Sequence, residues 1–204
     1  MLEVTRQMNE LIEQSEDLDK DKRYMAAADL CDLMLKEEVK IEPSLEKKVC
    51  QVFVNQLDDT SSEVSGNAVK CLSQVMSRIQ EQQVNEIIQK VMSHLLMERT
   101  TLSIYSTCAK QVIGDISPSY ATPVVRAFMP SIEKGLELAQ LEPREDSIEI
   151  LTDLLRRFGP NHPSLFNIAR IKDLLFHQLG HQSQSIRRRA SACFAALSNI
   201  LQNR

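Results

Sequence analysis

The sequence predicts an all-α fold, a right-handed α-solenoid of about five helical repeats, from three observations. An apolar pattern recurs about every 41 residues along the 204-residue chain. Glycine, which the tight turns of β-folds and the phosphate-binding loops of many enzymes require, occurs five times. Aromatic residues make up 4% of the chain, so Leu, Ile, Val, Met and Ala must form the core, and these residues suit packed helices.

The recurring pattern places four residues at offsets of 0, +4, +8 and +11, which keeps their side chains on one face of a helix. Its clearest copy is Val64, Ala68, Leu72 and Val75. The pattern starts five times, at Lys22, Val64, Leu102, Pro143 and Ile186. The residue at +4 is small in every copy, as the close approach of a neighbouring helix requires: Ala26, Ala68, Ser106, Ser147 and Ala190.

A second amphipathic segment precedes each copy, so helices are expected in pairs. These preceding segments are 3–15, 44–57, 83–97, 120–139 and 163–179. Two helices every 40 or so residues are typical of HEAT and armadillo repeats, in which each pair packs against the next. The sequence therefore predicts one HEAT-repeat array over 1–204, with repeats near 1–40, 41–80, 81–117, 118–160 and 161–204.

Local signals place the helix ends. Pro43, Pro123 and Pro163 suit first helical turns, where a missing N–H costs nothing. Gly159 before a proline predicts a helix stop. Pro130 falls inside the expected helix 120–139 and should kink or split it.

Acidic and hydroxyl side chains mark two helix starts, and the last helix indicates how the array ends. Residues 17–21 and 61–63 supply N-cap oxygens and first-turn negative charge. The final helix, expected over 183 to about 202, keeps its apolar pattern to Leu201. We expect a fragment of a longer array, and the alternative is a short natural protein with an unusual cap.

The distribution of charge and the lack of targeting signals limit the possible partners and cellular location of the protein. Residues 1–65 hold 8 lysines and arginines against 16 aspartates and glutamates, a net charge of −8 that disfavours nucleic acid. No stretch approaches the ~20 apolar residues of a membrane span, and the first residues lack the apolar region of a signal peptide. We expect a cytoplasmic and nuclear protein, monomeric when free. The five scattered cysteines are expected to be buried, reduced thiols: Cys31, Cys50, Cys71, Cys108 and Cys193.

No catalytic, cofactor or metal site is predicted. His177 and His181 have the i, i+4 spacing of paired zinc ligands, but a third ligand is absent, and we interpret them as surface or interhelix histidines. The glycine-rich and nucleophile motifs of common enzymes do not occur in the sequence. The expected function is therefore non-catalytic.

A helical wheel of the second helices predicts a strip that faces away from the core. This strip is polar in the second and fourth repeats but largely apolar in the first and third, where Tyr24 and Tyr105 stand out as anchors for a partner. On this basis Tyr105→Ala or Arg78→Glu should weaken partner binding and leave the stability of the fold nearly unchanged. The alternative is that irregular repeats bury these side chains. The candidate partner-binding residues are Tyr24, Asn67, Lys70, Gln74, Arg78, Tyr105, Asp146, Glu149, Asp153, Arg157, Arg188 and Arg189.

Three consecutive arginines, 187–189, open the last helix, where their charge opposes the helix dipole. Arg187 and Arg23 occupy the same position of the repeat pattern, and each is expected to pair with an acidic side chain of an adjacent repeat. Arg188 and Arg189 are expected to face a carboxylate or phosphate of a partner.

Several stretches resemble one protein family. Residues 19–26 read DKDKRYMA and 67–72 read NAVKCL, similar to the DKDxRFMA and LAVKCL stretches of the cullin-associated, neddylation-dissociated proteins. Further matches follow in the same order at 83–84, 112–114, 162–165 and 187–189. The resemblance weakens between about 118 and 145.

The resemblance implies the N-terminal segment of a regulator of cullin-RING ubiquitin ligases. In that family a HEAT solenoid wraps an unneddylated cullin and promotes exchange of substrate receptors, and its N-terminal repeats bind the C-terminal region of the cullin with its RING subunit. The same solenoid also occurs in nuclear-transport receptors and phosphatase scaffolds, which remain the alternatives.

Overall fold

The computed structural model describes residues 2–97 and 104–202, and the regular secondary structure of this part of the chain is entirely helical. Its α-helices are α1 (Leu2–Gln14), α2 (Lys20–Leu35), α3 (Pro43–Gln56), α4 (Ser62–Val75), α5 (Glu81–Leu95), α6 (Ile104–Asp115), α7 (Ala121–Glu137), α8 (Leu141–Phe158), α9 (Ile168–Leu179) and α10 (Gln184–Gln202). Two short 3-10 helices, Pro118–Tyr120 and Pro163–Leu165, precede α7 and α9.

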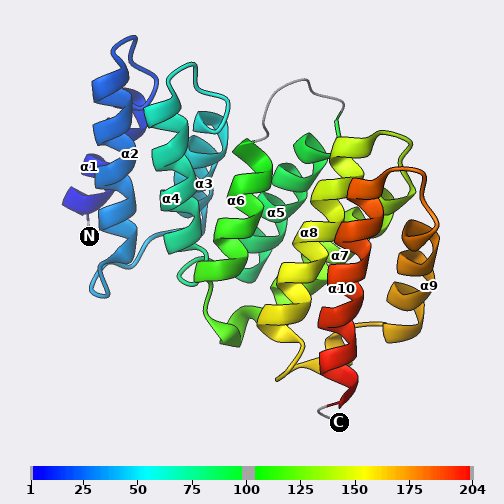
Figure 1. The fold of residues 1–204 in the computed structure, drawn as a ribbon. Coiled ribbons are helices and arrows are strands. Elements are labelled where there is room, and N and C mark those ends of the chain that lie inside the picture. Colours follow the sequence, from blue (N-terminus) through cyan, green and yellow to red (C-terminus); the bar gives the residue numbers. More distant parts are fainter. Residues whose placement is uncertain (1, 98–103, 203–204) are drawn as a thin grey trace.

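Consecutive helices form five hairpins, which we number as repeats one to five from α1–α2 to α9–α10. Each even-numbered helix packs against the next even-numbered helix, and each odd-numbered helix against the next odd-numbered one. The hairpins therefore stack into two layers, with the chain termini at opposite ends of the array (Figure 1). The predicted all-α solenoid is confirmed.

The repeating apolar pattern lies at the centre of each hairpin. Its clearest copy, Val64, Ala68, Leu72 and Val75, is completely buried. The small residues predicted for close helix approach are buried in every repeat as well. Gly135 of α7 shows how close this approach is, because a methyl group added there would lie 2.0 Å from the hydroxyl of Ser147 on α8.

The pattern of the third repeat starts three residues later than the sequence predicted. The expected first anchor, Leu102, lies outside the described residues, and Lys110, expected in the core, is half-buried and ion-paired with Glu149. The buried residues at the required offsets are instead Tyr105, Ala109, Ile113 and Ile116. The prediction was wrong because positions three residues apart share a helix side, and Ile113 fits both registers.

Three helix starts agree with their local signals. Pro43 is the first residue of α3, and Pro123 lies in the first turn of α7. Asp19 caps α2, and its side chain accepts a hydrogen bond of 2.9 Å from the backbone N–H of Asp21. Ser61 occupies the corresponding position of α4, but its side chain makes no capping bond.

Pro130 does not split α7, which was one of the two effects expected from sequence. The helix continues from Ala121 to Glu137 through the proline. Proline removes the hydrogen bond to the carbonyl of Arg126, and both residues are exposed, so water can satisfy that carbonyl. The cost of the proline is therefore reduced where the helix faces solvent.

Two further boundaries differ in detail. Pro163 starts a 3-10 helix rather than α9, which begins at Ile168 after Asn167 accepts a bond from the N–H of Arg170. Gly159 does end α8, but with a right-handed backbone. Glycine is needed there for space, because a methyl group would lie 2.2 Å from Ile200.

Candidate protein-binding surface

The even-numbered helices present a row of exposed side chains that runs through all five repeats. We call it the even-helix face. Its exposed residues are Tyr24, Met25, Asp32, Lys70, Gln74, Arg78, Thr107, Gln111, Asp115, Arg156, Arg157, Arg188 and Ala192. In Figure 1 the helices that carry it, α2, α4, α6, α8 and α10, follow one another across the molecule.

The first two repeats give this face an apolar edge beside exposed polar groups. Tyr24 is 43% exposed and Met25 63% exposed, both on α2. Lys70 and Gln74 are exposed on the neighbouring helix α4. Arg78 contacts Glu37 across 3.7 Å with both side chains largely in solvent, a weak contact that a partner could replace. This part of the face therefore offers apolar area together with unused hydrogen-bonding capacity.

Two candidates from the sequence are buried and cannot contact a partner. Asn67 is 8% exposed, and its amide donates to the backbone carbonyl of Tyr24 in the preceding repeat. Tyr105 is 1% exposed, stacks on His94 and donates its hydroxyl to Asp58 at 2.6 Å. The helical wheel wrongly predicted that Tyr105 is exposed, because it placed the pattern of the third repeat three residues too early. Tyr105 is instead buried against a neighbouring repeat, which was the alternative considered from sequence.

Charged residues on α6, α8 and α10 pair with one another across three repeats. Glu149 of α8 contacts Lys110 of α6 and accepts from Arg189 of α10 at 2.6 Å. Arg189 also lies 3.4 Å from Glu145. Although burial alone would raise the pKa of Glu149, the hydrogen bonds from these two cations lower it. Glu149 and Arg189 therefore join adjacent repeats rather than standing free for a partner.

Asp146 and Asp153 lie on the same helix in half-buried positions. The carboxylate of Asp146 accepts a bond of 2.8 Å from Ser106 on α6. Burial raises the pKa of Asp146 and is also the main cause of the raised pKa of Asp153. Both side chains thus belong to the α6–α8–α10 contact region more than to the open face.

The two remaining candidate arginines, Arg157 and Arg188, are both exposed. Arg188 is exposed beside an open hollow that Gln184, Ser185 and Ala192 also line. Arg157 is exposed, and its guanidinium donates to the backbone carbonyl of Ile116 at 3.2 Å. Both can still offer donors to a partner.

Arg23 and Arg187, which share a position in the repeat, were expected to pair with acids of adjacent repeats. For Arg23 this is confirmed, since its guanidinium binds Asp59 of the second repeat at 2.7 Å. For Arg187 it is wrong, because its guanidinium donates to two backbone carbonyls, those of His181 and Gln182, each at 2.7 Å. Arg23 makes the same contacts with residues 17 and 18, so this arginine fixes the loop before its helix.

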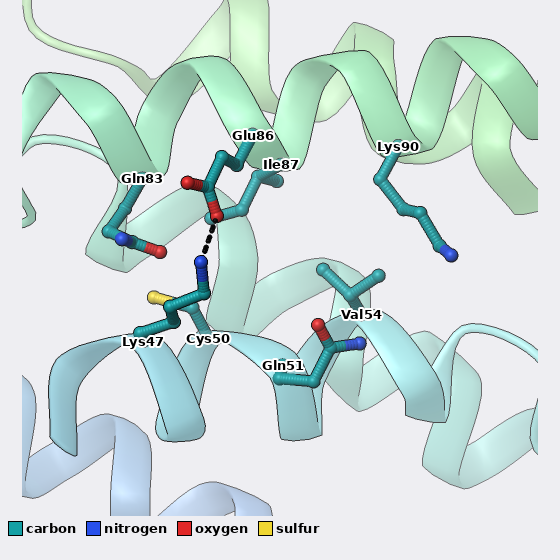
Figure 2. A pocket seen from close by; sticks show the side chains of 8 residues that line it. All are labelled: Lys47, Cys50, Gln51, Val54, Gln83, Glu86, Ile87 and Lys90. Carbon is teal, nitrogen blue, oxygen red and sulfur yellow. Dashed lines mark ion pairs between the residues drawn. The ribbon is translucent and has the colours of Figure 1, made fainter. Parts of the chain in front are cut away.

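The odd-numbered helices carry a small groove between α3 and α5, of about 170 Å³. Figure 2 shows Lys47 reaching across it to Glu86, an ion pair of 2.9 Å, beside Gln83 and Cys50. Lys90 stands at the far end of the groove. Because its apolar walls are buried and its mouth is spanned by an ion pair, the groove offers little surface to a protein.

Residues 2–97 and 104–202 contain no cluster of three or more His, Cys, Asp or Glu side chains that could hold a metal ion. His177 is exposed on α9, and His181 accepts a bond from the N–H of Ser183. The five cysteines are buried and free. Burial raises the pKa of Cys50 and of Cys108 to about 12, which keeps these thiols protonated and unreactive. In the same part of the chain, no helix is long and apolar enough to cross a membrane.

Several exposed apolar side chains were not among the candidates from sequence, and two of them, Met25 and Phe176, lie on helices next to aromatic residues. Met25 neighbours Tyr24 on α2, and its exposure could have been predicted from its place on the wheel. Phe176 of α9 is 55% exposed and packs edge-on against Phe194 of α10. The exposure of Phe176 was not predicted from sequence, because Phe176 lies in the apolar stripe of the segment 163–179 and an aromatic residue in such a stripe is expected in the core.

Sequence comparison matches the chain to segments of much longer proteins. It is 30% identical over 203 residues to cullin-associated NEDD8-dissociated protein 1 of Drosophila melanogaster, and 29% identical over 195 residues to the protein of the same name from Arabidopsis thaliana. These matches cover 96% and 91% of the chain. The chain is homologous to the cullin-associated NEDD8-dissociated proteins. It spans 16% and 15% of the length of these two relatives. No protein-family model matches the chain.

Solved structures share the fold of this chain. The MAST/Orbit N-terminal domain superposes with a TM-score of 0.65 at 11% identity, covering 94% of the chain and 83% of that domain. The CEP104 TOG domain gives a TM-score of 0.61 at 14% identity, covering 98% of the chain and 87% of that domain. At these identities the likeness shows a shared helical-repeat fold, which is typical of non-catalytic scaffolds.

Proposed function

We propose that the chain is a non-catalytic protein-binding module of a cullin-associated regulator. It binds unneddylated cullin-RING ligase cores and contributes to the exchange of their substrate receptors. The observation that carries the proposal is the similarity to cullin-associated NEDD8-dissociated proteins along more than 90% of the chain. The continuous even-helix face supports it, since HEAT solenoids bind partners along extended surfaces.

Within the even-helix face, the first two repeats are the proposed centre of binding. Tyrosine is among the residues that supply most of the binding energy in protein interfaces, and methionine is enriched in them, so the exposed Tyr24 and Met25 are the proposed anchors. Lys70, Gln74 and Arg78 provide the polar rim around them. Repeats three to five contribute Arg157 and Arg188 and hold the array rigid through the network around Glu149.

The proposed partner is the C-terminal region of a cullin together with its RING subunit. The net charge of −8 over residues 1–65 supports attraction to a basic surface. Charge of this kind accelerates encounter and orients the partners more than it strengthens the final complex. Residues of α1 and the loops carry much of it, so it surrounds the proposed contact area rather than forming it.

The proposal includes the setting and state of the protein. Cullin-RING ligases act inside the cell, and we place the chain in the cytoplasm and nucleus, monomeric until it meets a cullin.

The test is co-elution of the purified chain with a cullin-RING core in size-exclusion chromatography, at low and at moderate salt. The proposal predicts a joint peak that weakens as salt screens the charge attraction. A matched run uses the neddylated core, which should co-elute less. Separate elution from both cores at low salt, by a chain whose circular dichroism shows folded helices, would contradict the proposal.

A further inference from the structure

One leucine lies entirely in solvent, in the loop between α1 and α2. Leu18 is 100% exposed, whereas the other large apolar side chains that are exposed in the described part of the chain have 43% to 63% of their surface in solvent. Single exposed apolar residues are common on protein surfaces and need no special role. The exposure of Leu18 therefore matters only if the loop also fixes its position.

The backbone of this loop is fixed on both sides of Leu18. The guanidinium of Arg23 donates to the carbonyls of Asp17 and Leu18, each at 2.9 Å. Arg23 is itself held by two bonds to the carboxylate of Asp59 in the second repeat. The carboxylate of Asp17 accepts a bond of 2.9 Å from the N–H of Asp19. Because the loop is already ordered, binding through Leu18 costs little further conformational entropy.

The fifth repeat contains the same loop without a leucine. Arg187, which has the repeat position of Arg23, donates to the carbonyls of His181 and Gln182. Gln182 thus occupies the place of Leu18, and it is exposed too. In both loops the arginine holds backbone oxygens, which any residue supplies. The fold therefore does not require an apolar side chain at position 18.

The surroundings of Leu18 are acidic and polar. Residues 16–23 and 58–63, which form the loops of the first two repeats and the helix starts after them, hold seven acidic and three basic side chains. Between these loops lies an open hollow of about 620 Å³, which Leu18 borders together with Thr60 and Ser61. The hydroxyl of Ser61 does not cap α4. An apolar side chain in such surroundings is complementary to a surface whose apolar pocket has a basic rim.

We propose that Leu18 is an anchor that inserts into an apolar pocket with a basic rim on the cullin-RING core. The inference rests on the proposed function and adds a second contact, at the α1–α2 loop, to the even-helix face. Burial of a fully exposed leucine supplies affinity, and the acidic side chains around it orient the encounter. The rigid loop holds the leucine in the position that the pocket requires.

The experiment measures binding of the cullin-RING core to the full chain by calorimetry. Leu18→Gln introduces the residue that the fifth repeat carries at this position. It should weaken binding about tenfold and leave the midpoint of thermal unfolding unchanged. Leu201→Gln is the matched control, because Leu201 is 45% exposed on α10 at the opposite end of the array (Figure 1). This control should bind like the wild type.

A charge reversal tests the basic rim separately. Glu16 is exposed in the same loop, two residues before Leu18. Glu16→Lys should weaken binding severalfold at low salt, and the difference from the wild type should shrink as salt rises. Unchanged or tighter binding by Glu16→Lys would show that the pocket has no basic rim and would overturn the proposal.

Three further outcomes would overturn the anchor at Leu18. One is binding of Leu18→Gln with the affinity of the wild type or of Leu201→Gln. Another is a lowered unfolding midpoint of Leu18→Gln, which would assign the leucine to the fold. The third is a dimer of the free chain that Leu18→Gln dissociates, which would assign the leucine to a second copy. In each of these cases the wild-type chain still binds the core, whereas a wild-type chain that binds no core contradicts the proposed function as well.

Discussion

Asp58 and Asp59 are consecutive residues, yet they bind the second repeat to its two neighbours in opposite directions. Asp59 accepts two hydrogen bonds from the guanidinium of Arg23 in the first repeat, at 2.7 and 2.9 Å. Asp58 accepts the hydroxyl of Tyr105 in the third repeat at 2.6 Å. The loop between α3 and α4 is therefore a junction of three repeats, and its two acids can be tested separately.

Arg23→Ala should lower the free energy of unfolding by about 2–3 kcal/mol. The Arg23 and Asp59 side chains are 15% and 8% exposed, so the substitution leaves a nearly buried carboxylate without its cation. Lys20→Ala is the matched control, because Lys20 pairs with Glu63 across the same repeats with both side chains in solvent and should cost less than ~1 kcal/mol. Urea unfolding measures both. Equal losses in the two variants would show that the buried pair has no special role.

The same pair predicts how stability responds to acid. Hydrogen bonds from Arg23 are the main reason that the pKa of Asp59 lies below its ordinary value of 3.8. A lowered folded-state pKa adds stability above the unfolded pKa and loses it as the pH falls through the folded value. Below about pH 4 the wild type should thus lose stability more steeply than Asp59→Asn. Parallel slopes for both proteins in urea unfolding at stepped pH would refute this coupling.

Substitution of Tyr105 should affect the fold rather than partner binding, in contrast to the expectation from sequence. Tyr105→Ala removes a buried ring that stacks on His94 at a centroid distance of 4.7 Å and should cost about 3–5 kcal/mol. Tyr105→Phe keeps the ring and loses the bond to Asp58, at a cost of about 1 kcal/mol. Thermal and urea unfolding distinguish the two. A Tyr105→Ala protein as stable as the wild type would show that the ring does not support the core.

Two glycines in helices should respond to alanine with opposite signs. Gly66→Ala on α4 meets no atom within 4 Å and should stabilise the protein by about 0.5–1 kcal/mol through helix propensity. Gly135→Ala on α7 would place a methyl group against Ser147 and Leu96 and should destabilise by about 1–3 kcal/mol. Chemical unfolding of the pair tests whether the α7–α8 contact is as tight as described. Stabilisation by both substitutions would show that it is not.

The fold was predictable because the regular spacing of apolar and small residues identifies the repeat. Val64, Ala68, Leu72 and Val75 mark the buried face of one helix, and the same offsets recur at nearly constant intervals. The register of the third repeat was not predictable in this way, since Leu102 and Tyr105 start patterns that differ by less than one helical turn. That choice decided whether Tyr105 was assigned to the core or to a partner.

The candidate site was harder to predict than the fold. Whether a charged side chain is ion-paired depends on the side chains of the neighbouring repeat. A helical wheel of a single helix does not include those side chains. Glu149 was expected to face a partner, but Lys110 and Arg189 approach it from both sides. Lys70 and Gln74 were predicted to be exposed, and they are, because the polar face of α4 is unambiguous in sequence.

The most direct test of the account is the affinity of a cullin-RING core for two charge-reversed variants, measured by calorimetry. Lys70→Glu changes the even-helix face, whereas Lys48→Glu makes the same charge change on the exposed side of α3 in the other layer. The account predicts that Lys70→Glu weakens binding about tenfold, equivalent to ~1.4 kcal/mol, while Lys48→Glu binds like the wild type and both unfold normally. Equal weakening by both variants, or by Lys48→Glu alone, would contradict the claim that the even-helix face of the first two repeats binds the cullin.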